Sequence, residues 1–231
     1  MKILAVDSSA KSASAAITEN DFLISEGYVN IGLTHSETLL PLIDSALKNA
    51  GLGYGDIDAY AVTVGPGSFT GIRIGVATVK GLAAANNTTC SGVSTLEAMA
   101  RVCDYFEGII CCTMDARCNQ VYCALFKSSK KDKKRLTEDI AISTEELYNI
   151  LSSYELPVLL VGDGAELCYS LYCNRECDIT LANGLTRNQR AYGAALAALA
   201  QNVFKSACEI NPVYIRPPQA ERELKKKKES N

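Results

Sequence analysis

The sequence predicts an α/β protein built from two similar lobes. Short apolar runs typical of buried strands alternate with stretches that open on helix-capping residues. The order strand–strand–strand–helix–strand–helix occurs twice along the 231 residues, with a joint near residues 103–108. The repeat is one of element order rather than of residues, so it is a prediction of topology.

Composition excludes several classes of protein. A net charge of −3 gives no overall attraction to nucleic acid. No stretch approaches the roughly 20 apolar residues that a membrane helix needs, and the first residues turn polar at Asp7, which argues against a signal peptide. We therefore expect a cytoplasmic protein with no membrane contact. Its ten cysteines should be reduced, and mostly buried as small apolar side chains.

The first half contains four runs with strand character. The first is continuously apolar, and the next two flank a hairpin turn at residues 19–21. The predicted strands are 3–6, 12–18, 22–29 and 59–64.

A capping box predicts the first helix. Thr34 and Glu37 fit the pattern S/T-x-x-E, and the helix should end near Gly51. Pro41 conflicts with a start at Thr34, because proline has no N–H for an interior helical position. The regular helix therefore either begins near Thr38 or kinks at Pro41.

Two further helices complete the first half. The glycine-rich stretch 65–75 leads from the strand 59–64 into a helix that should reach about Asn86. Ser94 and Glu97 form a second capping box, which opens a helix to about Tyr105.

The second half repeats this order. The runs 108–114 and 121–126 predict a hairpin, and 157–161 predicts another buried strand. Residues 143–146 form a third capping box, and the alanine-rich stretch 186–206 predicts a long helix.

Two basic runs lie in this half, Lys130–Arg135 (KKDKKR) and Lys225–Lys228 (KKKK). We favour a solvated loop and a disordered tail. The alternative is direct contact with RNA phosphates, and that binding would weaken steeply with salt.

The stretch Gly65–Gly75 (GPGSFTGIRIG) is not a nucleotide-binding loop of either common type. A Walker A loop needs G-x-x-x-x-G-K-[ST], and a dinucleotide fingerprint needs G-x-G-x-x-G. Thr70 stands where both patterns require glycine, and no lysine follows.

A helix opening explains the stretch better. Ser68 or Thr70 can cap the helix, and Gly71 and Gly75 then lie one turn apart on one face. Since glycine costs about 1 kcal/mol against alanine inside a helix, this pair indicates close approach of another backbone. A partner helix and the chain's own sheet both remain open. The helix also carries an apolar stripe and two cations seven residues apart: Phe69, Ile72, Val76 and Val79, with Arg73 and Lys80.

The string 62–75 (VTVGPGSFTGIRIG) closely resembles the signature of the TsaB (YeaZ) family. Further motifs fall in the order of that family, over about residues 1–216. They are Asp7-Ser8-Ser9, His35-Ser36 with Leu39-Leu40-Pro41, Gly92-Val93-Ser94-Thr95-Leu96, Asp115-Ala116-Arg117 with Val121-Tyr122, Gly162-Asp163-Gly164 and Pro212-Val213-Tyr214-Ile215-Arg216.

The resemblance implies an ASKHA-type fold (actin/Hsp70/sugar kinase-like) of two ribonuclease-H-like lobes. Residues 1–105 would form the partner-binding lobe, 106–216 the second lobe, and 217–231 a charged, disordered tail. It also implies a non-catalytic role in making N6-threonylcarbamoyladenosine at position 37 of tRNAs that read ANN codons.

The partners implied are the transferase TsaD, bound as a heterodimer through helices 35–50 and 68–85, and the ATPase TsaE. The tRNA would be met only through this complex, and the chain alone could form a homodimer through the same exposed face. The expected partner-binding residues are His35, Leu39, Leu40, Ile43, Phe69, Gly71, Ile72, Arg73, Gly75, Val76 and Val79.

The residues support a non-catalytic role independently. In the related catalytic subunit an H-x-x-x-H pair holds a metal, but here His35 is followed four residues later by Leu39. His35 is the single histidine of the chain, so no two-histidine metal site and no catalytic residue is assigned, and the chain is expected to be an inactive glycoprotease homologue. We expect His35 to be an interface or capping residue.

A nucleotide site remains an alternative. Proteins of this fold bind phosphate after a strand ending in D-x-G, and here Ser8-Ser9 follow Asp7. The candidates are Asp7, Ser8, Gly162 and Gly164. ATP or ADP with Mg would then belong to the assembled complex, with no cofactor required by this chain. The competing function is an ATP-dependent phosphotransferase or ATPase that uses Asp7.

Overall fold

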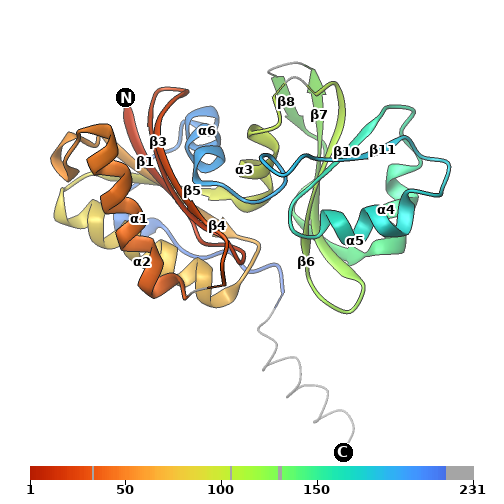
Figure 1. The fold of residues 1–231 in the computed structure, drawn as a ribbon, viewed down its shortest axis with the longest axis horizontal. Coiled ribbons are helices and arrows are strands. Elements are labelled where there is room, and N and C mark those ends of the chain that lie inside the picture. Colours follow the sequence, from red (N-terminus) through yellow and green to blue (C-terminus); the bar gives the residue numbers. More distant parts are fainter. Residues whose placement is uncertain (33, 105, 130–131, 217–231) are drawn as a thin grey trace, which may run out of the picture.

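The computed structural model describes residues 1–32, 34–104, 106–129 and 132–216. Two lobes lie side by side, each built around one β-sheet with helices on both faces (Figure 1). The expected α/β class and its repeated order of elements are confirmed.

The first sheet has five strands in the order β3-β2-β1-β4-β5. β1 runs antiparallel to β2 and parallel to β4, and β4 runs parallel to β5. The strands are β1 (Lys2–Asp7), β2 (Ala13–Glu19), β3 (Phe22–Val29), β4 (Ala59–Gly65) and β5 (Thr89–Ser94).

The second sheet repeats this topology as β8-β7-β6-β10-β11, with β9 also pairing with β7. β6 again runs antiparallel to its hairpin partner and parallel to the next strand of the sheet. The strands are β6 (Gly108–Asp115), β7 (Gln120–Ser129), β8 (Asp132–Arg135), β9 (Ile140–Ser143), β10 (Val158–Val161) and β11 (Ile179–Leu181).

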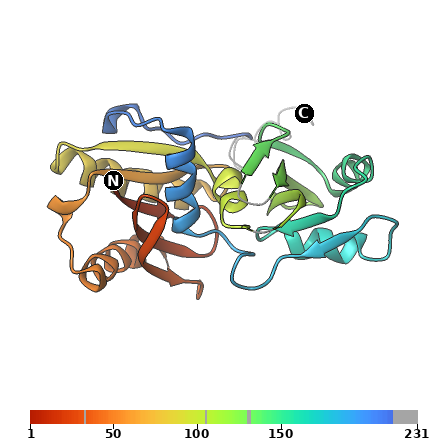
Figure 2. The same cartoon turned by 90° about the horizontal axis from the view of Figure 1, so that it is seen from above.

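Helices cover both faces of each sheet, as Figures 1 and 2 show. α1 (His35–Ala50) and α2 (Phe69–Ala85) cover the outer face of the first sheet, and α6 (Ala191–Gln201) covers its inner face. In the second lobe the outer helices are α4 (Thr144–Leu151) and α5 (Ala165–Tyr172), and the inner helix is α3 (Thr95–Arg101). Two single turns complete the fold, η1 (Tyr54–Asp56) and η2 (Ala207–Glu209).

This layering explains the continuously apolar strands. Ile3, Leu4, Ala5 and Val6 of β1 are all fully buried, with alternate side chains in the outer and inner cores of the first lobe. A strand with helices on both faces has no solvent side, so its sequence does not alternate. Six of the ten cysteines are buried, as expected, and all ten are free.

The start of α1 decides between the two predicted alternatives. The helix begins at His35 and continues through Pro41, so the predicted start near Thr38 is wrong. Thr34 occupies the N-cap, but its side chain accepts no capping hydrogen bond. The third capping box is confirmed, because Ser143 and Glu146 bond reciprocally at the start of α4.

The segment 186–206 differs from its prediction in length and in place. Only Ala191–Gln201 is helical, and this helix packs on β1, β2, β4 and β5 of the first lobe. Residues 205 and 210 continue on the first lobe, since Lys205 pairs with Cys90 and Ile210 lies in the outer core. The predicted boundary of a second lobe at 106–216 is therefore corrected. The predicted tail at 217–231 lies outside the described residues.

The inner helices α3 and α6 form the joint between the lobes (Figure 2). Gly193 of α6 lies against the backbone of Ala98 in α3, and any larger side chain at 193 would overlap that carbonyl group. The opposite side of α3 buries Leu96 and Met99 in the core of the second lobe. α3 is thereby packed against both lobes.

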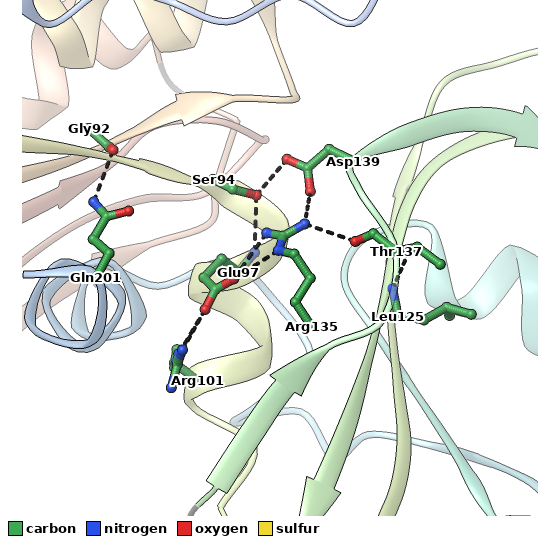
Figure 3. A network of polar contacts seen from close by, with 9 residues as sticks. All are labelled: Gly92, Ser94, Glu97, Arg101, Leu125, Arg135, Thr137, Asp139 and Gln201. Carbon is green, nitrogen blue, oxygen red and sulfur yellow. Dashed lines mark hydrogen bonds and ion pairs between the residues drawn. The ribbon is translucent and has the colours of Figure 1, made fainter. Parts of the chain in front are cut away.

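A polar network centred on Arg135 reinforces this joint (Figure 3). The Arg135 guanidinium bonds to Glu97 of α3 at 3.0 Å and to Asp139 at 2.6 Å, and Asp139 accepts a 2.6 Å hydrogen bond from Ser94 at the end of β5. Glu97 also holds Arg101 at 2.6 Å. These side chains are about one-fifth to one-quarter exposed, so they are only partly screened by water.

α2 sits unusually close to the loop that follows β1. A Cβ at position 71 would overlap the Ser8 carbonyl oxygen, whereas a Cβ at position 81 would meet nothing. The Ser8 hydroxyl donates to the Gly71 carbonyl at 2.9 Å. The small residue at 71 is therefore required by internal packing.

Arg135→Gln should lower the free energy of unfolding by about 2 kcal/mol, because it leaves the partly buried Asp139 without its cation and Glu97 with Arg101 alone. The matched control is Arg175→Gln, which removes an exposed pair with Glu145 inside one lobe and should cost less than about 1 kcal/mol. Urea unfolding measures both. Equal losses would contradict a reinforcing role at the joint.

Gly71→Ala and Gly81→Ala should change stability in opposite directions. At 71 the methyl group forces α2 away from the Ser8 loop, at a cost of about 1–3 kcal/mol. At 81 the helix gains up to about 1 kcal/mol from the better propensity of alanine. Thermal and urea unfolding of the two variants check this; a neutral Gly71→Ala would mean that the close contact is not needed.

Candidate functional site

The stretch Gly65–Gly75 forms the end of β4, a turn and the first turns of α2. Ser68 is the N-cap, and its hydroxyl accepts from the Gly71 N–H at 3.2 Å. The Ser68 N–H donates to the Ser9 carbonyl at 2.7 Å, which ties the turn to the loop after β1. Gly67 has a φ of +149° and packs directly on that carbonyl. The prediction of a capped helix opening is confirmed.

The glycine pair serves the chain's own packing. Gly71 faces the Ser8 carbonyl and the ring of His35, and Gly75 faces the Ser8 hydroxyl. Both glycines are buried. Their expected role as an outward seam for a partner helix is therefore wrong, because the close backbone that they admit is the loop after β1.

Most of the expected partner-binding residues lie in the core. Leu39 and Ile43 of α1, with Ile72, Val76 and Val79 of α2, belong to the outer core of the first lobe. The residues of that set that reach the surface are His35, Leu40, Phe69 and Arg73. His35 is half-buried, and its Nε2 lies 2.8 Å from the Ala10 carbonyl.

The outward face of the two helices combines Leu40 with residues outside the expected set. Ala77 and Gly81 of α2 are exposed with little side chain, and Leu40 of α1 is 48% exposed. Arg73 marks one border of this face. Ala77 follows the buried Gly75 by two residues, so the helical period could have separated the two faces had the buried side been known.

The two cations seven residues apart have a structural role that the sequence did not reveal. Lys80 donates to the Ile210 carbonyl at 3.0 Å, and Arg73 donates to the Tyr214 hydroxyl at 2.7 Å. They hold the segment 207–216, the C-terminal strap, along the side of α2. Their spacing was the available signal, since positions seven apart share one side of a helix.

A cleft of about 400 Å³ lies between the lobes. Its walls combine the loop after β1, the start of α2 and the β6–β7 hairpin. Lys11 and Arg117 bring positive charge, and Phe69 and Tyr122 bring aromatic surface. The full lining is Ser9, Ala10, Lys11, Gly67, Ser68, Phe69, Met114, Asp115, Ala116, Arg117, Tyr122 and Asp163.

A second hollow of about 260 Å³ adjoins it and shares Ala10, Lys11 and Asp163. Gly162 lines this hollow, and Asp163 accepts a 3.0 Å hydrogen bond from Gln189. Of the four expected nucleotide residues, only Gly162 reaches either space. Gly164 packs on the backbone of Met114 and Asp115.

Asp7 and Ser8 lie beneath the cleft. Asp7 Oδ1 accepts from the Ser9 N–H at 2.9 Å and from the Ser9 hydroxyl at 2.7 Å, while its Oδ2 is buried without a partner among the described residues. Burial raises the pKa of this carboxyl above its usual value. Asp7 and Ser8 thus shape the floor of the cleft without lining it.

Two cations of the basic run Lys130–Arg135 face inward, Lys133 and Arg135, whereas Asp132 and Lys134 are exposed. The side chain of Lys133 is 1% exposed and lies 3.9 Å from Asp104, and Arg135 belongs to the interlobe network. Residues 132–135 form the edge strand β8 and were expected to be a loop. Lys130, Lys131 and the run Lys225–Lys228 lie outside the described residues.

No helix in the described ranges combines the length and the apolar character that spanning a bilayer requires.

The free energy of unfolding of the Asp7→Asn variant should increasingly exceed that of the unsubstituted protein as the pH rises. A carboxyl whose pKa is raised by folding binds its proton more tightly in the folded state, so its ionisation above the ordinary value of 3.8 lowers the stability of the fold. Asparagine cannot ionise. The difference should be smallest near pH 4 and should grow as the pH rises towards the raised pKa of Asp7; urea unfolding from pH 4 to pH 8 measures it, and a difference independent of pH would contradict it.

Comparison with known proteins identifies relatives of this chain. Residues 32–226 match the family model described as TsaD, tRNA N6-adenosine threonylcarbamoyltransferase. A Bacillus subtilis protein named "tRNA threonylcarbamoyladenosine biosynthesis protein TsaB" is 32% identical over 72% of this chain and 73% of its own. A Haemophilus influenzae protein of the same name is 31% identical over 94% of each chain.

Solved structures agree at the level of the fold. YeaZ from Pseudomonas aeruginosa superposes with a TM-score of 0.77 at 25% identity, covering 92% of this chain and 99% of its own. A Listeria monocytogenes protein described as an N-acetylmannosamine kinase reaches 0.51 at 11% identity over 88% of this chain and 100% of its own, a likeness of fold alone. The expected ASKHA-type, sugar kinase-like fold is confirmed. By its relatives and its structural neighbours, the chain belongs to the TsaB (YeaZ) family.

Proposed function

We propose that this chain is the non-catalytic partner of the transferase TsaD in forming N6-threonylcarbamoyladenosine at position 37 of tRNAs that read ANN codons. The supporting observation is family membership, since its relatives carry the name of threonylcarbamoyladenosine biosynthesis proteins. In this proposal the chain acts on tRNA modification in the cytoplasm, and the ATPase TsaE is a further member of the complex. The tRNA is met through the complex rather than by this chain alone.

The geometry around His35 supports a non-catalytic role. His35 is the single histidine of the chain, and its Nε2 is engaged by the Ala10 carbonyl at 2.8 Å. Four residues later, where a second histidine would complete a metal pair, Leu39 is 1% exposed and packs in the outer core. A ligand at that position would have to leave the core, so the pair cannot be formed by a local change of side chain.

The partner surface that we propose is the outward face of α1 and α2. On α2 the face carries almost no side chain at Ala77 and Gly81, and on α1 the apolar Leu40 lies among exposed polar residues such as Glu37, Asp44 and Lys48. Such a face allows the backbone of a facing helix to approach closely. The same face would bring two copies of this chain together when TsaD is absent.

ATP or ADP with Mg, in this proposal, is a component of the complex and not a requirement of this chain. The alternative, an ATP-dependent phosphotransferase, is favoured by one observation: Lys11 and Arg117 line a cleft of about 400 Å³ between the lobes. It requires steady ATP turnover by the isolated chain that is lost in Asp7→Ala. Turnover of that kind would replace the proposed function.

Ala77→Arg should weaken TsaD binding at least tenfold, because it places a long charged side chain on the flat outward face of α2. Leu171→Arg is the matched control: Leu171 is a 43% exposed apolar residue on α5 of the other lobe, and its substitution should leave binding unchanged. Calorimetric titration with purified TsaD gives the affinities, and a tRNA modification assay gives the activity.

Thermal unfolding must first show that both arginine variants remain folded. Equal TsaD affinity of the two variants would contradict the proposed surface. No stimulation of tRNA modification by the unsubstituted chain would contradict the proposed function itself.

A further inference from the structure

The C-terminal strap (residues 207–216) touches both lobes. After the single turn η2 it has no regular secondary structure, yet hydrogen bonds and ring contacts hold it at several points. It runs beside α2 and ends against the second lobe, so it connects the proposed partner surface with the interlobe region.

The first half of the strap is fixed to the first lobe. Ile210 is 5% exposed and packs in the outer core, and Lys80 of α2 donates to its carbonyl at 3.0 Å. The Val213 N–H donates to the Val64 carbonyl of β4 at 2.8 Å. The Val213 carbonyl packs on Gly65, where a Cβ would overlap it.

Tyr214 then anchors the strap on the start of α2. Its ring stacks on Phe69 with centroids 4.5 Å apart and planes 18° from parallel. Arg73 donates to its hydroxyl at 2.7 Å and lies 5.5 Å from the ring centre. Arg73 stands at the border of the outward face of α2, so a partner on that face lies next to this anchor.

Arg216 carries the strap to the second lobe. Its Nη1 donates to the Gln120 side-chain oxygen at 2.7 Å, and its guanidinium lies 5.8 Å from the Tyr122 ring. Gln120 begins β7 directly after three residues with positive φ, Arg117 to Asn119. Non-glycine residues in this conformation carry strain, so the hairpin depends on its surroundings to hold its shape.

The Tyr214 contact with α2 and the Arg216 contact with the second lobe both involve aromatic residues that line the cleft. Phe69 and Tyr122 line the interlobe cleft, and both also lie against the strap. The free space enclosed among these two rings, Tyr214 and Arg216 is only about 10 Å³. Side chains packed this closely cannot shift independently of one another.

We propose that the strap couples the outward face of α2 to the β6–β7 hairpin of the cleft. A displacement of the Arg73–Tyr214 contact shifts Phe69 and the strap. Arg216 then transmits this shift to Gln120 and Tyr122. The coupling is reciprocal, so a ligand that orders the hairpin also orders the start of α2. The identity of what docks on α2 rests on the proposed function, whereas the coupling itself belongs to the isolated chain.

Hydrogen exchange on the full-length chain tests the coupling without any partner. Arg73→Met should speed exchange at least threefold at the hydrogen-bonded amides of Ala116, Arg117 and Gln120, none of which touches Arg73. Arg216→Met should do the same at Gly71 and Ile72. Arg175→Met removes a polar contact with Glu145 and a ring contact with Tyr148, none of them residues of the strap, and should change neither region.

Two outcomes would overturn the coupling: faster exchange confined to the substituted side in both variants, or equal effects in Arg175→Met. Additive effects in the double variant Arg73→Met/Arg216→Met would also overturn it, because coupled contacts are lost together.

Purified TsaD extends the test to the docking face. TsaD should slow exchange at residues 116–122 in the unsubstituted chain at least threefold, and this slowing should vanish in Arg216→Met. Equal slowing in both chains would overturn the proposal. If TsaD does not bind the unsubstituted chain at all, the proposed function fails while the result on the isolated chain still decides the coupling.

Discussion

The structure depends on one contact, the close approach of α2 to the loop that follows β1. Ser8 donates to the Gly71 carbonyl at 2.9 Å, and the Ser68 N–H donates to Ser9 at 2.7 Å, so the helix and the loop share their hydrogen bonds. Glycine at 67, 71 and 75 makes this distance accessible. The same contact places Asp7 under the cleft, directs Ala77 outward and positions Phe69 for the strap.

The two lobes repeat one topology but differ in what their outer helices offer. α2 presents the small residues Ala77 and Gly81 outward, whereas Arg175, just after α5, ties Tyr172 of α5 to Glu145 and Tyr148 of α4 through charged and aromatic contacts. Between the lobes, the backbone contact of Gly193 with Ala98 and the Arg135 network fix one arrangement. An exposed helical face on one lobe and a joint of this kind would suit the proposed role as a partner protein.

Local signals predicted the fold well where they were strong. Apolar runs identified β1, β4 and β6, and Ser143 with Glu146 marked the start of α4. Sequence patterns did not locate β8, because a lysine-rich run is typical of a solvated loop. The structure shows instead that Lys133 is buried beside Asp104. They also overextended α6, since alanine content signals helix propensity and says nothing of which lobe the helix covers.

For the site, spacing indicated that Gly71 and Gly75 admit a neighbouring backbone, but only the three-dimensional packing identifies Ser8 as that neighbour.

The placement of α6 has a consequence for biosynthesis. Residues 108–181, the strands and outer helices of the second lobe, are contiguous in the chain, whereas the first sheet lacks its inner cover until residue 201. During translation the second sheet can close before the first, although its strands are made later. Within the described residues, the α-helix that is made last, α6, completes the lobe that was begun first.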